Sequence, residues 1–177
     1  VLFGADGVSG YNTDYSGFLS AYRSIRGAVP PGVVGMAGAG GVGRAVAFGL
    51  LTLGATEIRL FDRVADKAEK LAEALRDAAT GTVVTVCATS EEMARTATGL
   101  VNCTQVGMVG YPGTPIPRSV VAGAEWAFDA VYTPIETQFL LDAAAEGLQI
   151  LSGYELFFYQ GVHAWAIFSG APLDEAQ

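Results

Sequence analysis

The sequence predicts an α/β protein in which a mostly parallel sheet of about six strands has helices on both faces. Two observations lead to this fold class. Short apolar segments alternate with amphipathic segments along most of the 177 residues, and the first apolar segment of this series runs into a cluster of glycines. Alternation of strands and helices is typical of βαβ units, whose strands are parallel and buried on both faces.

Composition places the chain among globular proteins. Hydrophobic residues make up 51% and charged residues 16% of it, whereas disordered chains combine low hydrophobicity with high charge. The formal net charge of -8 disfavours non-specific binding to nucleic acid or to an anionic membrane, and no apolar run is long enough to span a bilayer. Two cysteines, Cys87 and Cys103, are too few for a disulfide framework, so we expect a cytoplasmic protein. No histidine–cysteine cluster has the spacing of metal ligands, and we expect no metal.

The first 28 residues are expected to be a connecting segment. Residues 1–14 are rich in Gly, Asp and Asn and predict a loop or short strand, after which Asp14 is expected to cap a helix through about Arg26. Val29-Pro30-Pro31-Gly32 then marks a boundary. The chain begins without methionine or a signal-peptide pattern, and we therefore expect a piece of a longer polypeptide.

Strands and helices alternate after this boundary. The predicted strands are 33–37, 57–61, 82–87, 99–102, 126–129 and 149–151. The predicted helices are 42–53, 65–79, 90–95, 136–146 and about 154–169. The strands are short and apolar or β-branched, and helix 65–79 carries apolar residues at helical spacing. We therefore expect residues 29–177 to form one doubly wound domain of the Rossmann type.

The glycine-rich turn after the first of these strands has the spacing of a dinucleotide-binding motif. Gly38, Gly40 and Gly43 form G-x-G-x-x-G between a predicted strand and a predicted helix. The first glycine permits the tight turn, the second lets the backbone approach a pyrophosphate, and the third lets the helix pack closely on the strand. The pyrophosphate would bind at the N-terminal end of the helix, where free N–H groups favour anions. A glycine-rich turn without a ligand is the alternative.

Asp62 follows the next predicted strand, 22 residues after Gly40. An acidic residue at this place accepts hydrogen bonds from the adenosine ribose, and its carboxylate would repel a 2′-phosphate. The sequence therefore favours NAD over NADP. Arg63 keeps NADP open because an arginine can pair with a 2′-phosphate. The alternative for Asp62 is a strand-end residue that caps helix 65–79.

Polar residues gather at other predicted strand ends and helix starts. Asn12, Thr13 and Asp14 could hold a polyhydroxylated ligand or simply form a turn with a helix cap. Segments 102–108 and 129–134 follow predicted strands, where doubly wound sheets bind ligands. Tyr132 in the second segment could bond a ligand or lie half-buried, and Gln160 is a polar residue in the aromatic start of the last helix. His163, the single histidine, is expected to be structural.

Taken in order, these segments resemble the shikimate dehydrogenase family, including its quinate/shikimate dehydrogenase branch. The matching segments are 10–14, 38–41, 102–108, 129–137 and 153–160, and the resemblance spans essentially the whole chain. It implies the C-terminal nucleotide-binding lobe of a two-lobed enzyme, together with a connection from the N-terminal substrate lobe over residues 1–28. It also implies that the last helix packs back toward the substrate lobe, which would be missing here.

The resemblance implies reversible hydride transfer between C3 of shikimate or quinate and a nicotinamide cofactor, NAD with NADP possible. It implies that Asp14 is the catalytic aspartate, with its lysine partner in the missing lobe, and that Asn12, Thr13, Tyr132 and Gln160 contact substrate. It implies cofactor contacts from Gly38, Ala39, Gly40, Gly41, Val42, Asp62, Arg63, Lys67, Thr104, Gln105, Ala130, Gly153 and Leu156. Asp62-Arg63-Val64 departs from the Asn-Arg-Thr of NADP-preferring members, which again favours NAD.

Other functions stay open at this point. A regulatory nucleotide-binding module could share the fold, although it would not need Asp14, Tyr132 and Gln160. A related dehydrogenase could act on aminoshikimate or methylene-tetrahydrofolate. The sequence does not separate shikimate from quinate, and a homodimer is one candidate assembly. A small-molecule substrate is expected, and neither nucleic acid nor membrane is an expected partner.

Overall fold

The computed structural model describes residues 1–4 and 7–171. Within them, a six-stranded sheet has the order β5-β4-β3-β6-β7-β8, and every neighbouring pair of its strands is parallel. The strands are β3 (Val33–Ala37), β4 (Glu57–Phe61), β5 (Val83–Val86), β6 (Gly99–Asn102), β7 (Trp126–Asp129) and β8 (Gln149–Leu151). The predicted doubly wound α/β class is confirmed.

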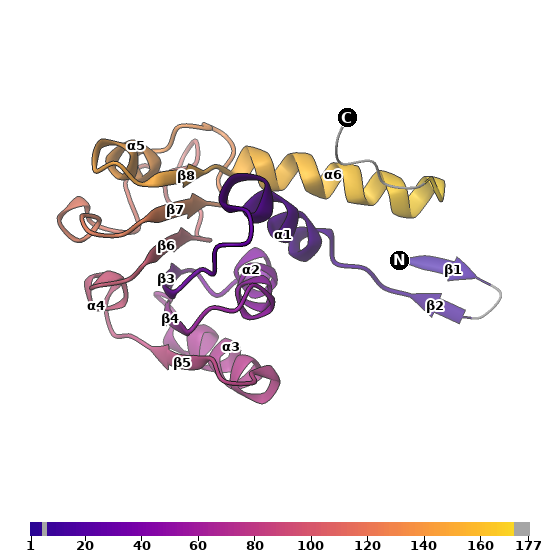
Figure 1. Ribbon diagram of the computed structural model, residues 1–177, viewed down its shortest axis with the longest axis horizontal. Helices are drawn as coiled ribbons and strands as arrows, with labels where there is room; N and C mark the ends of the chain where they lie inside the picture. Colours follow the sequence, from indigo (N-terminus) through magenta and orange to yellow (C-terminus); the bar gives the residue numbers. More distant parts are fainter. Residues whose placement is uncertain (5–6, 172–177) are drawn as a thin grey trace.

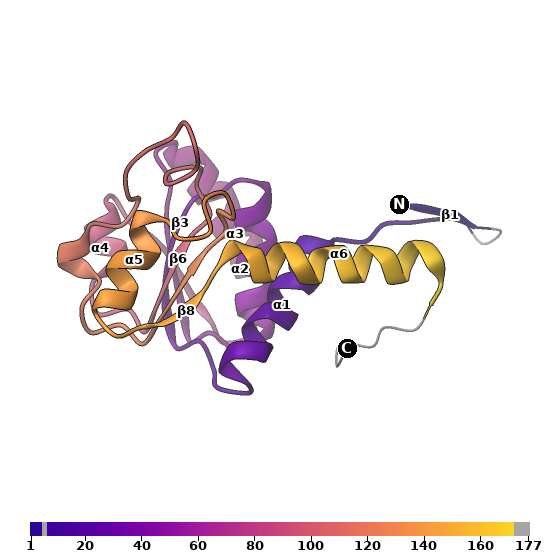
Figure 2. The same ribbon diagram turned by 90° about the horizontal axis from the view of Figure 1, so that it is seen from above.

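Helices cover both faces of this sheet. One face carries α1 (Thr13–Arg26), α2 (Gly41–Thr52) and α3 (Ala65–Ala78), and the other carries α4 (Ser90–Ala94) and α5 (Gln138–Ala145) (Figure 2). The 3-10 helix η1 (Arg118–Val120) packs on the same side as α4 and α5. The last helix, α6 (Gly153–Ser169), extends beyond the sheet. In the described part of the chain, none of the helices combines the length and the apolar character needed to cross a membrane.

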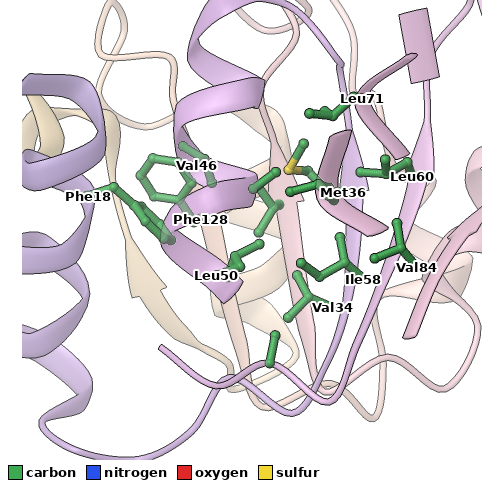
Figure 3. Close-up of a cluster of buried hydrophobic side chains, with 14 of the residues drawn as sticks. Phe18, Val34, Met36, Val46, Leu50, Ile58, Leu60, Leu71, Val84 and Phe128 are labelled. Atoms are coloured by element: carbon green, nitrogen blue, oxygen red, sulfur yellow. The ribbon is translucent and has the colours of Figure 1, made fainter. Parts of the chain in front are cut away.

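The larger hydrophobic core lies between the sheet and the first of these faces (Figure 3). Val46 and Leu50 of α2 point toward Met36 of β3 and Ile58 of β4, and all four side chains are buried. Burying an apolar side chain of this size contributes roughly 1.5–3 kcal/mol to stability. The core therefore fixes α2 over β3, and with it the glycine-rich turn that joins them.

Strand register aligns the carboxyl ends of the central strands. Ala37 at the end of β3 is level with Phe61 of β4 and with Asn102 of β6, and Asn102 is level with Asp129 of β7. The loops that follow these strands consequently start at the same edge of the sheet. The chain order reverses between β3 and β6, which is the switch point where doubly wound sheets bind ligands.

The N-terminal region differs in detail from the prediction. Residues 1–14 contain an antiparallel hairpin, β1 (Leu2–Gly4) and β2 (Gly7–Ser9), which projects away from the sheet (Figure 1). The predicted cap of α1 was wrong. Asn12 is the cap, with its side chain accepting a hydrogen bond from the Tyr15 N–H at 3.1 Å, and Asp14 lies in the first turn. An Asn one residue before the helix has the extended backbone that a cap needs, whereas Asp14 is already helical.

Helix α1 belongs to the same packed unit as the sheet. Its Phe18 and Tyr22 are buried in the larger core, and Arg26 bonds Glu125 and Gln149 at 3.1 Å each. Helices α1 and α6 lie side by side in both ribbon views (Figures 1 and 2). The division of the chain at residue 28 stays a prediction, because this packing does not decide to which lobe α1 belongs.

Candidate dinucleotide-binding site

A cleft of about 830 Å³ opens at the carboxyl edge of the sheet, at the switch point. The glycine-rich turn forms one wall, the end of β4 the second, and the loop after β6 the third. The cleft brings together most of the predicted nucleotide-binding residues: Gly38, Gly40, Gly41, Val42, Asp62, Arg63, Lys67, Thr104 and Gln105.

The glycines of the turn serve two different purposes. Gly38 has φ 99°, and a Cβ there would lie 2.6 Å from the carbonyl carbon and oxygen of Cys103. A Cβ at Gly43 would collide with the carbonyl oxygen of Gly38. Gly40 and Gly41 instead face open space. The first and third motif glycines therefore permit packing, and the middle pair keeps the cleft free for a ligand.

The start of α2 suits an anion. The residue before α2 is Gly40, so within the described chain no cap side chain bonds the free N–H groups at the start of this helix. The first turn of α2 contains no acidic residue. Gly40, Gly41 and Val42, at the start of this helix, line the cleft. A helix N-terminus with free N–H groups and no competing carboxylate binds phosphate favourably. The residues present thus fit the pyrophosphate of a dinucleotide.

Asp62 ties the end of β4 to the glycine-rich turn. Its Oδ2 accepts a hydrogen bond from the Ala39 N–H at 2.8 Å, and its Oδ1 accepts one from the Val64 N–H at 2.9 Å. Ala39 therefore contributes through its backbone to the shape of the cleft. The cap of α3 is Val64, which makes no side-chain cap bond, so Asp62 is not that helix's cap. Arg63 and Lys67 are exposed on the same wall.

Two buried polar residues that sequence analysis had not assigned hold the loops after β6 and β7. Asn102 donates to Asp129 Oδ1 at 2.9 Å, and its own Oδ1 accepts from the backbone N–H and the hydroxyl of Thr104 at 2.8 and 2.7 Å. Asp129 also accepts from the Val131 N–H at 2.9 Å and from the Thr137 hydroxyl at 2.6 Å. The pair thereby fixes the loops that carry Thr104 and Tyr132.

Burial controls ionisation in this region. It raises the pKa of Asp129 to about 6, although the hydrogen bonds from Thr137, Val131 and Asn102 act in the opposite direction. Burial also raises the pKa of the Cys103 thiol, with the Asp129 charge acting in the same sense. Cys103 therefore stays a neutral thiol, and it is suited to packing rather than to nucleophilic attack.

Sequence analysis also missed part of the cleft wall. Beyond the predicted segment 102–108, the loop after β6 also lines the cleft with Tyr111, Pro112, Thr114 and Pro115. Its shape is held by backbone bonds from Gly107 to Tyr111 at 2.7 Å and from Val109 to Thr133 at 3.2 Å. Its position after a switch-point strand was the available signal, because the sequence itself shows only a loop rich in Gly and Pro.

The predicted substrate residues lie outside this cleft, on and beside the α1–α6 pair. Asp14 and Gln160 are partly buried on the two helices. Tyr132 is 52% exposed and stacks on Phe157 of α6, with ring centroids 5.0 Å apart. Asn12 caps α1 and Thr13 is its first residue.

Besides Ala39, whose backbone bonds Asp62, three of the predicted cofactor residues do not line the cleft. Ala130 donates its N–H to the Asn102 carbonyl at 2.8 Å. Gly153 packs on the backbone of Ala130, since a Cβ there would lie 2.6 Å from the Ala130 carbonyl oxygen. Leu156 is buried in the larger core. All three lie where β7 and α6 meet, which is the junction between the cleft edge and the α1–α6 pair.

Another hollow, of about 820 Å³, lies along the outer face of α2 and takes in Asn12, Tyr15, Arg44 and Thr52. Several of its polar groups have partners within the protein. The Tyr15 and Thr52 hydroxyls are 2.9 Å apart, Asn12 caps α1, and the Arg44 guanidinium lies over the Phe48 ring. We assign no ligand to this hollow, because it gathers one of the predicted site residues, Asn12, whereas the cleft gathers nine.

Comparison with known proteins identifies similar chains. Residues 33–109 match the family model described as NADP oxidoreductase coenzyme F420-dependent. The chain is 39% identical over 168 residues to a shikimate dehydrogenase (NADP(+)) of Pseudarthrobacter chlorophenolicus, covering 93% of this chain and 57% of that protein. It is 38% identical over 180 residues to a quinate/shikimate dehydrogenase (NAD(+)) of Corynebacterium efficiens, covering 98% and 62%.

A solved structure agrees with these relatives. The quinate dehydrogenase from Corynebacterium glutamicum in complex with NAD matches with a TM-score of 0.87 and 35% identity, covering 98% of this chain and 63% of that one. The chain therefore spans about three fifths of the length of the proteins it matches.

Proposed function

Because this chain is a homologue of the shikimate and quinate dehydrogenases along nearly its whole length, we propose that it is the nucleotide-binding part of such an oxidoreductase. The reaction proposed is reversible hydride transfer between C3 of shikimate or quinate and a nicotinamide cofactor. The observation that carries this proposal is the switch-point cleft, in which Gly40, Gly41 and Asp62 meet the Thr104 loop.

The nucleotide half of the site is proposed to be built as follows. Gly40, Gly41 and Val42 hold the pyrophosphate at the start of α2, and Asp62 receives the adenosine ribose. Bound there, the cofactor supplies the hydride acceptor or donor. The fixed carboxylate of Asp62, held by the Ala39 and Val64 N–H groups, supports NAD as the preferred cofactor. Arg63 and Lys67 beside it keep NADP as a weaker alternative.

The substrate half is proposed to lie beside α1 and α6. Asp14 orients the reacting hydroxyl and takes part in moving its proton, because a carboxylate within hydrogen-bond reach can assist an acid–base step. Tyr132 and Gln160 hold the carboxylate and ring of the substrate. Lys67 and Lys70 lie on α3, away from α1, and a lysine partner for Asp14 is expected outside these 177 residues.

The proposed function also includes a cellular location and an oligomeric state. Cys87 and Cys103 are free thiols, which supports a reducing, cytoplasmic location. A homodimer stays an expectation, and light scattering of the purified protein would test it.

The proposal is tested by measuring turnover of the full-length protein. Absorbance at 340 nm is followed with shikimate and with quinate, each against NAD and NADP, and Asp14→Asn is the matched variant. Reduction of NAD with either acid, lost in Asp14→Asn, is the expected result. Nucleotide binding without turnover in all four combinations would instead favour a regulatory module or another substrate. Activity with NADP alone would show that Arg63 outweighs Asp62.

A further inference from the structure

Helices α1 and α6 are in backbone contact at one point. A Cβ built on Gly17 would lie 2.9 Å from the backbone nitrogen of Gln160 and 3.2 Å from the carbonyl oxygen of Leu156. Only glycine permits such an approach. The contact involves Gln160 itself, and Asp14 lies about one helical turn before Gly17. The crossing of the two helices therefore adjoins both residues that the proposed function places at the substrate.

A histidine bridges the two helices beside this crossing. His163 Nδ1 lies 2.6 Å from Ser16 Oγ, and His163 Nε2 lies 3.3 Å from Ser20 Oγ. Ser16 and Ser20 are four residues apart and share one face of α1. His163 follows Gln160 by three residues, so it lies about one turn further along α6. A single ring on α6 is thus connected to two successive turns of α1.

The chemistry of this bridge suits a fixed geometry. A neutral imidazole donates from one ring nitrogen and accepts at the other, whereas a serine hydroxyl can donate or accept. Both serines can therefore keep their bonds to His163 in either tautomer. A ring held at both nitrogens resists rotation, and it consequently resists sliding of α1 along α6.

We propose that His163 is a positioning residue, which through Ser16 and Ser20 sets the placement of Asp14 relative to Gln160. This inference rests on the proposed function, because it takes these two residues as ligands of the hydroxy acid. Misplacing a reacting group by about 1 Å can cost on the order of a hundredfold in rate. A bridge that holds two helices in register is therefore enough to affect turnover without touching the substrate.

The test separates the substrate from the nucleotide. His163→Ala and Ser16→Ala are made in the full-length protein, and kcat and KM for shikimate and quinate are measured alongside the Kd for NAD. We expect kcat/KM for the hydroxy acid to fall by about tenfold or more, while the Kd for NAD stays within about twofold. Neither His163 nor Ser16 lines the nucleotide-binding cleft. A histidine that only stabilises the fold would lower Tm without separating the two ligands.

Two further variants sharpen the result. His163→Asn keeps an amide near the position of Nδ1, so it should retain the Ser16 contact and recover most of kcat/KM. Ser24→Ala is the matched control, because the Ser24 hydroxyl bonds the Ala21 carbonyl of its own helix at 2.9 Å, and it should leave both ligands unchanged. Ser16→Ala combined with His163→Ala should be no worse than His163→Ala alone, since both remove the same contact.

The outcomes are distinct. A parent protein that turns over neither acid refutes the proposed function, and this inference with it. An active parent whose His163→Ala and Ser16→Ala variants keep kcat/KM within about twofold overturns the positioning role alone. If His163→Ala does not fold, the same comparison of kcat/KM for the hydroxy acid with the Kd for NAD is made on His163→Asn and Ser16→Ala.

Discussion

Asn102 donates its side-chain amide to the buried carboxylate of Asp129 at 2.9 Å. The two residues end adjacent parallel strands at the same level of the sheet. Each also bonds the loop that follows its own strand, through Thr104 and Val131. The edge of the sheet that forms the cleft is therefore held by a buried polar pair rather than by apolar packing alone.

Asn102→Ala tests this pair. The change leaves Asp129 without one donor and Thr104 without its acceptor, and leaving buried polar groups unpaired costs roughly 1–3 kcal/mol each. We expect the free energy of unfolding, measured in urea, to fall by about 3 kcal/mol, and NAD binding to weaken. Asn12→Ala is the matched control, since loss of an exposed helix cap costs about 1 kcal/mol. Equal losses in the two variants would contradict the role given to Asn102.

Gly40 and Gly38 should respond differently to alanine. Gly40→Ala meets open space, so the free energy of unfolding should change by less than about 1 kcal/mol, while its methyl group enters the cleft and weakens NAD binding. Gly38→Ala combines a φ of 99° with a Cβ 2.6 Å from the Cys103 carbonyl, and it should cost about 2–4 kcal/mol. Denaturation curves and NAD titrations separate the two effects. A Gly40→Ala variant that binds NAD as the parent does would argue against pyrophosphate at this turn.

Asp62→Asn should change the choice between dinucleotides. The substitution removes a negative charge from a wall that keeps Arg63 and Lys67. We expect the affinity for NADP relative to NAD to rise by about tenfold, because the repulsion of a 2′-phosphate is lost. Titrations of both dinucleotides at one ionic strength measure this ratio. Asp66→Asn, in the first turn of α3 and outside the cleft, is the matched change and should leave the ratio as it was.

Asp129 should make stability depend on pH with a definite sign. Burial raises the pKa of Asp129 from its ordinary value of 3.8 to about 6 in the folded protein, so the folded state holds this proton more tightly than the unfolded state. The resulting stabilisation is fully present below about pH 4 and is lost as the pH rises through 6. The full span of such a shift is on the order of 3 kcal/mol.

Asp129→Asn tests that sign. The variant lacks this ionisation, so its free energy of unfolding should become larger relative to that of the parent, and the variant relatively more stable, as the pH rises from 4 to 7. Urea denaturation at intervals of pH gives the difference directly, and the other carboxylates cancel in it. A difference that does not change with pH would mean that Asp129 is ionised alike in both states.

Much of the fold was predictable because its signals are local. The alternation of apolar strands with amphipathic helices identified the doubly wound sheet, and its strands start or end within a residue of the predicted bounds. G-x-G-x-x-G predicted the turn at Gly38, since a φ of 99° is a property that the sequence shows through the residue type itself. The position of Asp62 at the end of a strand was equally visible.

The helix cap shows the limit of local signals. Asn12, Thr13 and Asp14 are all good caps by residue type, and the choice among them depends on where the backbone turns helical. Phe18 and Tyr22, several residues further along, are buried in the core, and such tertiary packing of a helix is not visible in the residue types at 12–14.

The sequence by itself determined the class of fold, the place of the glycine-rich turn and the acidic residue that follows the next strand. Only the tertiary structure decided which distant groups meet: Asn102 with Asp129, the Tyr111 loop with the cleft, and His163 with Ser16 and Ser20. The physical reason is that backbone preferences and hydrophobic periodicity act over a few neighbouring residues. Strand register and helix crossing instead bring together side chains that are 27 to 147 positions apart.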